Sequence, residues 1–173
     1  MAATISTFAS SLDDLGIPVT RTDASSLDER IDELVAQPAV GVSLSDTFDD
    51  PSLSLAQTTV EIDPTPASLR EATTGVTGAR LGIGEYGSLV LRMTDRGSEL
   101  VSLFVDRHVA VVRESDIVSE MKTAVDALDD EIGRTRGSAI IATGPSATAD
   151  MGALVRGAHG PRDVRVLVLE EGA

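Results

Sequence analysis

The sequence predicts an α/β fold in which helices flank a mainly parallel sheet. Short apolar runs alternate with amphipathic stretches along the chain, and this alternation is typical of parallel strands joined by helices. A length of 173 residues suits a single domain with its own core. Because aromatic residues make up only 2% of the chain, that core has to be mostly aliphatic.

In the first half of the chain, the helical spacing of Leu27 and Ile31 predicts an amphipathic helix. Ser25 or Ser26 is its expected N-cap, and Glu29 is the capping-box partner of Ser26. The elements expected in this half are a helix at 7–15 ended by Gly16, a strand from 17, this second helix closed by Pro38, a strand at 39–42, a loop at 43–57, a strand at 58–62 and a short helix from 64 to 72.

The clearest helix of the sequence lies in the second half. Apolar side chains recur every three or four residues from Ile117 to Ile132, which predicts a helix over 116–132 that Gly133 ends. The strands expected in this half lie at 79–83, 88–93, 109–113, 138–142 and 164–169. Residues 82–87 match the G-x-G-x-x-G string of dinucleotide-binding loops, but a strand follows where that motif needs a helix. We therefore expect a tight turn between two strands there.

Acidic side chains outnumber basic ones by 28 to 14, which gives a formal net charge of −14. Such a surface repels nucleic acid and anionic lipid, so neither is an expected partner. Lys122 is the only lysine, and excess acid with almost no lysine resembles the surface of a halophilic protein, whose self-repulsion is screened by salt. An ordinary solvated surface is the simpler interpretation of the same charges.

The chain has no cysteine. It therefore forms no disulfide, offers no thiolate to a metal, and holds no iron–sulfur cluster through cysteine. Its two histidines, His108 and His159, lack the spacing of a metal-binding pair, so no metal site is expected. The sequence opens without a basic and apolar leader, and no run approaches about 18 apolar residues. We therefore expect a soluble cytoplasmic protein.

The most informative segment is 143–150, with the sequence Thr-Gly-Pro-Ser-Ala-Thr-Ala-Asp, together with the His-Gly-Pro at 159–161. It follows the apolar run 138–142, which is expected to be a buried strand. A strand that enters a Gly-Pro-Ser turn and then a short helix aims backbone N–H groups at one point, where the helix dipole adds partial positive charge. The expected capping residues are Ser146, Thr148 and Asp150. The segment predicts a docking site for an anion, whose identity stays open.

The charge distribution favours an anionic ligand. From residue 134 onward, five arginines face four acidic residues, so this segment lacks the acid excess of the rest of the chain. A carboxylate or phosphate suits such a segment, and Arg156 and Arg162 are the candidate guanidinium forks. The alternative is that the arginines merely pair with nearby acids.

Glu85 and His159 are the candidates for acid–base chemistry. Glu85 lies at the tip of the turn between two strands and His159 in a loop before the last strand, and each carries a group that can transfer a proton. The structural alternatives are a solvated carboxylate and a hydrogen-bonded loop histidine. His108 begins a strand and is expected to make a structural contact. Ser146 lacks the G-x-S-x-G elbow of a nucleophile, so capping is its expected role.

Four stretches give the chain a resemblance to the LUD (lactate utilisation) domain family, DUF162, and within it to the protein C group. They are residues 75–91, 107–112, 143–150 and 157–162. Their order and spacing match over 56–173, whereas 1–55 carries little motif content, so the resemblance describes a single LUD domain over 1–173. Ala147 stands where the family commonly has an arginine, and its presence removes one direct charge contact to an anion.

The resemblance implies the NagB/RpiA/CoA-transferase-like fold and a role as the non-redox component of an iron–sulfur system that oxidises L-lactate to pyruvate. The expected partners are the iron–sulfur subunits, and no cofactor is expected in this chain. A small anionic ligand is expected at Thr143, Gly144, Pro145, Ser146, Thr148, Asp150, His159, Gly160 and Arg162. The alternatives are a stand-alone enzyme acting on a sugar phosphate or CoA ester and a pure interaction or regulatory module. Catalysis and assembly as a homo-oligomer stay open.

Overall fold

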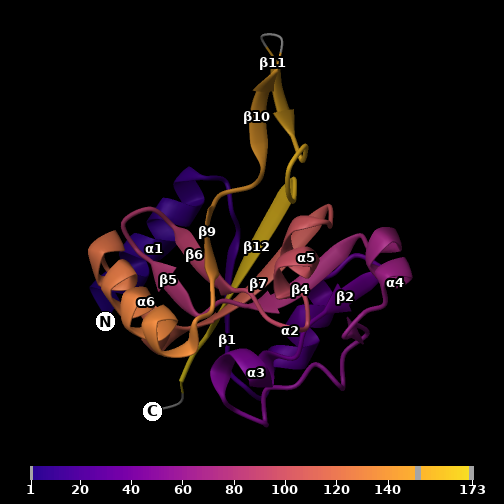
Figure 1. Cartoon of the computed structure of the whole chain (residues 1–173), viewed down its shortest axis with the longest axis horizontal. Coiled ribbons are helices and arrows are strands. Elements are labelled where there is room, and N and C mark those ends of the chain that lie inside the picture. The colour runs from indigo at the N-terminus through magenta and orange to yellow at the C-terminus, as the bar shows by residue number, and fades with distance from the viewer. Residues whose placement is uncertain (1, 151–152, 172–173) are drawn as a thin grey trace.

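The computed structural model describes residues 2–150 and 153–171 (Figure 1). The helices are α1 (Ala2–Asp14), α2 (Leu27–Leu34), α3 (Leu44–Phe48), α4 (Pro66–Glu71), α5 (Ser98–Leu103) and α6 (Met121–Thr135), with a 3-10 turn at Glu114–Asp116. The strands are β1 (Val19–Thr22), β2 (Ala39–Gly41), β3 (Glu61–Ile62), β4 (Thr74–Gly78), β5 (Leu81–Ile83), β6 (Ser88–Arg92), β7 (Arg107–Arg113), β8 (Ile117–Val118), β9 (Ala139–Thr143), β10 (Ala147–Asp150), β11 (Ala153–Arg156) and β12 (Asp163–Leu169).

A six-stranded sheet in the order β1-β12-β7-β4-β2-β3 forms the centre of the fold, and all of its pairings are parallel. Strand β7 shows why it is buried on both faces. Val109 and Val111 pack with α2 and α3, whereas Ala110 and Val112 face the opposite core with α1. Successive side chains of β7 therefore pack into two different cores, one on each face of the sheet. The predicted α/β class with helices around a parallel sheet is confirmed.

A second sheet of four strands, in the order β8-β5-β6-β9, lies beside the first. Its pairs β5–β6 and β6–β9 are antiparallel, and β5–β8 is parallel. Leu89 and Leu91 of β6 join the core that contains α1 and β12, while Val90 turns to the other side and packs with Ala124 and Leu128 of α6. The order of the layers is therefore α2 and α3, the parallel sheet, α1 with the second sheet, and α6.

The hairpin of β10 and β11, here called the arm, projects from the body of the molecule (Figure 1). Its described side chains are mostly exposed, including Leu154 at 66%. The short helix predicted after the Gly-Pro-Ser turn is wrong, because residues 147–150 pair in antiparallel register with 153–156. Of the residues that indicated helix caps, Thr148 and Asp150 lie in this strand, and Ser146 comes directly before it.

Several boundaries also differ from the sequence expectation. The predicted loop 43–57 contains α3, which buries Leu44 and Phe48 one helical turn apart. Helix α6 begins later than residue 116, since Ile117 belongs to β8. It continues through Gly133 to Thr135, and its C-cap is Arg136, which has φ of 53°. Strand 138–142 is only half-buried, because β9 is the edge strand of the second sheet.

The predicted capping box of α2 does not form. Ser26 has no side-chain hydrogen bond at the N-cap position. Instead, Asp23 accepts hydrogen bonds through Oδ1 from the backbone N–H groups of Ser25 and Ser26, at 2.9 and 3.0 Å. The tight turn between the strands at 82–87 is confirmed: β5 and β6 pair across it, and Gly87 has φ of 62°.

Candidate functional site

A pocket of about 390 Å³ lies where the base of the arm meets the amino ends of β7 and β12. We call it the main pocket. Seven of the nine residues predicted to bind a ligand line it, namely Thr143, Gly144, Pro145, Ser146, Thr148, His159 and Gly160. Because β7 and β12 are parallel, their amino ends share one edge of the sheet, and the segments that precede them meet there.

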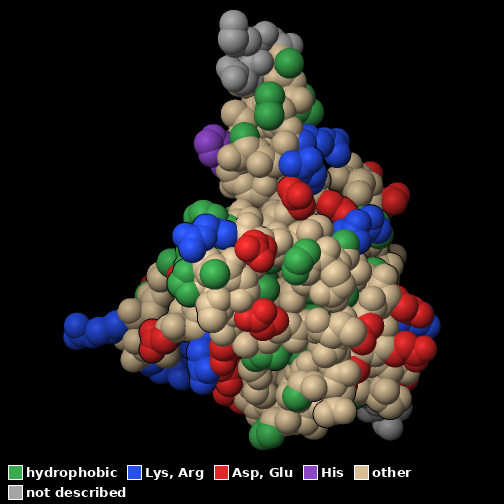
Figure 2. Space-filling view, turned by 90° about the vertical axis from the view of Figure 1, so that its right-hand side faces the viewer, with side chains coloured by type: hydrophobic (Ala, Val, Ile, Leu, Met, Phe, Trp, Pro, Cys, Tyr) green, Lys and Arg blue, Asp and Glu red, His purple; other side chains and the backbone are tan. Residues whose placement is uncertain are grey.

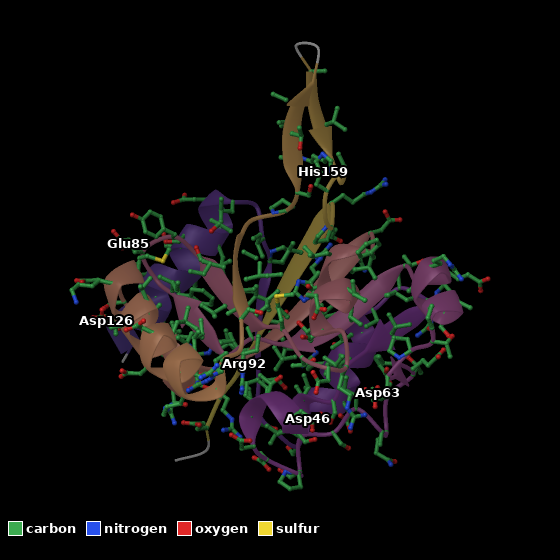
Figure 3. The ribbon with its side chains drawn as sticks, in the orientation of Figure 1. Asp46, Asp63, Glu85, Arg92, Asp126 and His159 are labelled. Carbon is green, nitrogen blue, oxygen red and sulfur yellow. The ribbon has the colours of Figure 1, made fainter. Side chains whose placement is uncertain are left out.

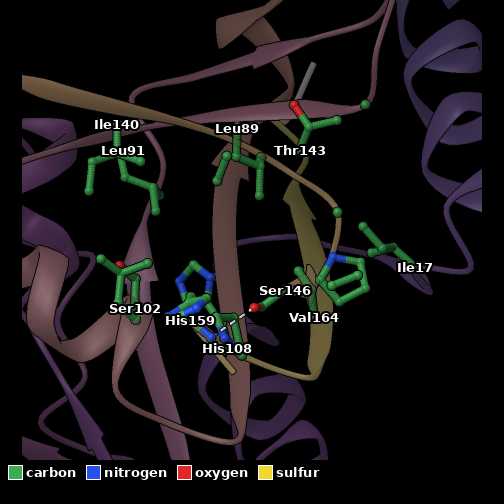
Figure 4. Close-up of a pocket in the computed structure, with 18 of the residues that line it drawn as sticks. Ile17, Leu89, Leu91, Ser102, His108, Ile140, Thr143, Ser146, His159 and Val164 are labelled. Atoms are coloured by element: carbon green, nitrogen blue, oxygen red, sulfur yellow. Dashed lines mark hydrogen bonds between the residues drawn. The ribbon is translucent and has the colours of Figure 1, made fainter. Parts of the chain in front are cut away.

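Ser146 ties the two ends of the arm together at the rim of this pocket. Its N–H donates to the carbonyl of Pro161 at 2.8 Å, and its carbonyl accepts from the N–H of Gly157 at 3.0 Å. Its hydroxyl accepts from the N–H of His159 at 3.2 Å (Figure 4). Gly144, with φ of 74°, makes the preceding turn in the left-handed region that glycine adopts without strain. These contacts fix the loop 157–161 against the turn.

The same contacts correct the predicted mechanism of anion docking. The backbone N–H groups of Ser146 and His159 bond within the protein, so they are not aimed at a ligand. Residues 147–150 form a strand, so no helix dipole adds positive charge at the turn. A ligand in the main pocket is left with side-chain donors and with the remaining backbone groups.

His108 lies on the wall of the main pocket, a role that the sequence did not suggest. Its ring is buried, with 3% exposure, and Nε2 lies 2.8 Å from Oγ1 of Thr77. Burial lowers the pKa of His108 to about 4, so the ring is neutral at neutral pH. The signal that could have found it is the pairing of β7 with β12, which places His108 opposite Val164, just after the loop that carries His159.

The two histidines occupy different positions in the pocket. His159 is exposed at the base of the arm, whereas His108 is enclosed by the sheet. In Figure 4 both imidazole rings and Ser146 lie in the lower half of the view, below Leu89 and Thr143. A ligand in the main pocket can therefore meet a buried neutral ring and a solvent-accessible ring.

The rest of the wall consists of hydroxyl and aliphatic side chains. Oγ1 of Thr143 lies 2.6 Å from Oγ of Ser88, which joins the end of β9 to the start of β6. Apolar contacts are offered by Ile17, Leu89, Leu91, Leu103, Ile140 and Val164. Among the described residues, no Asp, Glu, Lys or Arg lines the main pocket. Its chemistry is that of a partly apolar site without charged Asp, Glu, Lys or Arg side chains and with hydrogen-bonding groups in its wall.

The remaining predicted residues lie elsewhere or outside the description. Arg162 pairs with Asp106, with 3.0 Å between Nε and Oδ1, and Arg156 lies exposed on β11. Glu85 does not line the pocket: its Oε2 accepts from the N–H of Met121 at 3.3 Å, so it caps the first turn of α6. Figure 3 shows Glu85 near α6 and well away from His159. The side chain of Asp150 lies outside the described residues.

Within residues 2–149 and 153–171, no group of three or more His, Asp or Glu side chains gathers in a way that could hold a metal ion. In the same ranges, no helix combines the length and the apolar character needed to cross a bilayer.

The comparisons with known proteins agree with the fold and the motifs. The LUD domain matches residues 45–169. Lactate utilization protein C of Deinococcus radiodurans is 33% identical over 137 residues, which cover 78% of this chain and 59% of that protein. Lactate utilization protein C of Bacillus velezensis is 36% identical over 95 residues, which cover 53% of this chain and 39% of that protein. This chain therefore spans less than two thirds of the length of either relative.

A solved structure extends the similarity to the whole fold. The crystal structure of a DUF162 family protein from Deinococcus radiodurans superposes with a TM-score of 0.75 and 25% sequence identity, and the match covers 97% of both chains. The family match covers most of the sequence, and it includes the motif segments and most strands of the two sheets. The chain belongs to the LUD domain family.

Proposed function

We propose that this protein is a non-redox component of an iron–sulfur system that oxidises L-lactate to pyruvate, and that its main pocket binds the small carboxylate. Two similar proteins bear the name Lactate utilization protein C, which supports a role in lactate use. The chain has no cysteine, so electron transfer through cysteine-held clusters belongs to partner proteins. This division of work leaves binding and positioning of a substrate or product to the chain itself.

The observation that carries the proposal is the composition of the main pocket. His159, Ser146 and Thr143 supply hydrogen-bonding groups, and aliphatic side chains line other parts of the pocket. L-Lactate presents a carboxylate and a hydroxyl at one end and a methyl group at the other, so its polar part suits the hydrogen-bonding groups and its methyl group suits the aliphatic side chains. Because the lining residues carry no fixed negative charge, they do not repel the carboxylate as the rest of the surface does.

Calorimetric titration of L-lactate and pyruvate tests the site, with His159→Gln as the variant. His159 is exposed, so its replacement leaves the fold intact while removing an imidazole from the pocket. We expect the affinity for both acids to fall about tenfold, as for loss of one hydrogen bond to a charged group. A strain that carries the variant is expected to grow more slowly on L-lactate.

Ser10→Ala is the matched control, because Ser10 is an exposed residue of α1 that does not line the main pocket. Its affinity is expected to equal that of the wild type. If the wild-type protein bound neither acid, the assignment of the pocket to a small carboxylate would be wrong. If His159→Gln bound as tightly as Ser10→Ala, the binding site would lie elsewhere.

A further inference from the structure

A second cavity of about 390 Å³, separate from the main pocket, gathers arginine side chains. We call it the arginine cavity. Its guanidinium groups come from Arg80, Arg92, Arg113 and Arg134, which are four of the 14 basic residues of an acidic chain. The two cavities share no lining residue. In Figure 3, Arg92 lies between α6 and α3, whereas His159 lies at the base of the arm.

The topology of the parallel sheet explains where these arginines meet. Arg113 is the last residue of β7, and Arg80 follows the end of β4 by two residues, so both lie at the carboxyl edge of the sheet. In the strand order, β3 follows β2 toward one edge of the sheet, whereas β7 follows β4 toward the opposite edge. The strand order thus reverses between β2 and β4. In open α/β sheets, the crevice outside the carboxyl ends at such a reversal is where ligands bind.

Three acidic side chains of the described residues line the cavity, and two of them, Asp116 and Glu131, are engaged by the arginines, whereas Asp49 is not paired with any of the four. Glu131 bridges two of them, with one carboxylate oxygen 3.2 Å from Nε of Arg80 and the other 2.9 Å from Nε of Arg92. Asp116 lies 3.3 Å from Nη1 of Arg80. Because these carboxylates are already paired, they are not free to form a cation site. The pairs also hold Arg80 and Arg92 in place.

Some N–H groups of these arginines have no acceptor among the described residues. Arg113 bonds through Nη2 to Asp50 at 2.9 Å, and its guanidinium carbon lies 5.0 Å from the centre of the Phe48 ring. Arg134 donates through Nε to the carbonyl of Asp130 at 3.1 Å. Both Nη groups of Arg92 and of Arg134 have no hydrogen-bond partner among the described residues. Guanidinium groups held by other contacts and with free N–H groups are suited to binding an oxyanion.

We infer that the arginine cavity binds a phosphate group, either free or as part of a small ester. A phosphate carries more charge than a carboxylate and has enough oxygen atoms to accept from several guanidinium groups at once. Four arginines, from β6, β7, α6 and the connection between β4 and β5, surround the space, whereas one guanidinium group is enough to bind a monocarboxylate. Three of the arginines, Arg80, Arg92 and Arg113, are partly buried, with Arg113 at 22% exposure, so that water screens their contacts less than on the open surface.

Titration of the full chain with inorganic phosphate at constant ionic strength tests the site, with Arg134→Gln as the variant. Arg134 is exposed at the end of α6, so its replacement is not expected to unfold the protein. We expect phosphate to bind the wild type, and the affinity to fall about tenfold or more in the variant. A second variant, Arg92→Gln, is expected to show the same loss.

Arg156→Gln on the arm removes the same charge far from the cavity and serves as the control. Its phosphate affinity is expected to stay within about twofold of the wild type. An equal loss in Arg156→Gln and Arg134→Gln would show that only overall charge matters and would overturn the site, as would the absence of phosphate binding by the wild type. Glycerol phosphate in a parallel titration identifies the source: tighter binding than inorganic phosphate indicates an ester, and weaker binding indicates the free ion.

Discussion

At the scale of single residues, His108 combines a structural contact with a place in the main pocket. Its ring is buried between strands and bonds to Thr77 through Nε2. A charged imidazolium there would lose its hydration without gaining a carboxylate partner, which is why burial lowers its pKa to about 4. The fold therefore keeps this histidine neutral over the whole range in which an ordinary histidine titrates.

The lowered pKa of His108 predicts an acid-sensitive stability. Above pH 6.5 the ring is neutral in both the folded and the unfolded chain, so pH has no effect through this group. Between pH 6.5 and about 4 the unfolded chain takes up a proton that the folded chain does not. The free energy of unfolding is expected to fall over this range by about 3 kcal/mol through His108 alone. Urea unfolding at a series of pH values measures the change.

His108→Gln provides the comparison, since its amide nitrogen can replace Nε2 in the contact with Thr77. The variant is expected to lose less stability than the wild type between pH 6.5 and about 4. Carboxylates such as Asp163 titrate alike in both proteins, so their contribution cancels in the comparison. Parallel pH curves for the two proteins would show that His108 is protonated in the folded state.

At the scale of elements, the close packing of α5 against β4 depends on one glycine. A Cβ added at Gly75 would lie 2.0 Å from the backbone oxygen of Val101, a distance that no rotamer change relieves. Val101 itself packs with Val40 and Val42 of the neighbouring strand region. The helix therefore approaches the sheet more closely than a strand with a side chain at position 75 would allow.

Gly75→Ala is expected to destabilise the protein by about 3 kcal/mol, because α5 has to move away from β4 to admit the methyl group. Gly133→Ala is the control, since a Cβ at Gly133 meets no atom within 4 Å and the residue lies inside α6. The free energy of unfolding of that variant is expected to rise by about 1 kcal/mol, because alanine has a higher helix propensity than glycine. Thermal unfolding distinguishes the two, and a Gly75→Ala variant as stable as the wild type would contradict the packing described.

Elements that are defined by local periodicity were predictable from the sequence, and elements defined by distant partners were not. The spacing of Leu27 and Ile31 predicted α2, and the Gly-rich segment 82–87 predicted the turn between β5 and β6, because both signals act within a few residues. The segment 147–150 formed a strand because 153–156 pairs with it. Capping residues alone did not distinguish a helix start from this hairpin.

At the scale of the whole molecule, the acidic surface sets the response to salt. The chain carries a formal net charge of −14, and Figure 2 shows acidic side chains spread over one face of the body with basic ones beside several of them. Repulsion among the unpaired acids opposes the compact state. Exposed ion pairs, such as Arg21 with Glu170, weaken in salt, but such pairs contribute little to stability.

Raising KCl from about 0.1 M to about 1 M is therefore expected to stabilise the protein, because the screening length falls from about 10 to about 3 Å. A gain of about 1 kcal/mol corresponds to a rise in Tm of roughly 3 to 4 °C for a chain of this size. Differential scanning calorimetry measures it, with sucrose at matched water activity as the control for non-ionic effects. An unchanged or lower Tm in KCl would mean that the ion pairs outweigh the repulsion.

The two candidate sites also show what a sequence conveys about a whole molecule. Most of the main pocket comes from one contiguous segment and the loop at 157–161, so its residues could be proposed together. His108 joins them only through the pairing of β7 with β12. The arginine cavity draws on residues 80, 92, 113 and 134, which no local pattern connects. The cavity forms where the carboxyl ends of β4 and β7 meet β6 and α6.

The position of β12 between β1 and β7 has a consequence for biosynthesis. Strand β1 is translated long before its neighbour in the sheet, which comes from residues 163–169. Until β12 has been translated, the edges of β1 and β7 that pair with it have no strand to bond to. Such long-range closure is slow and leaves nascent chains open to wrong pairing. Chaperone capture of stalled chains is thus expected to end when Leu169 clears the exit tunnel.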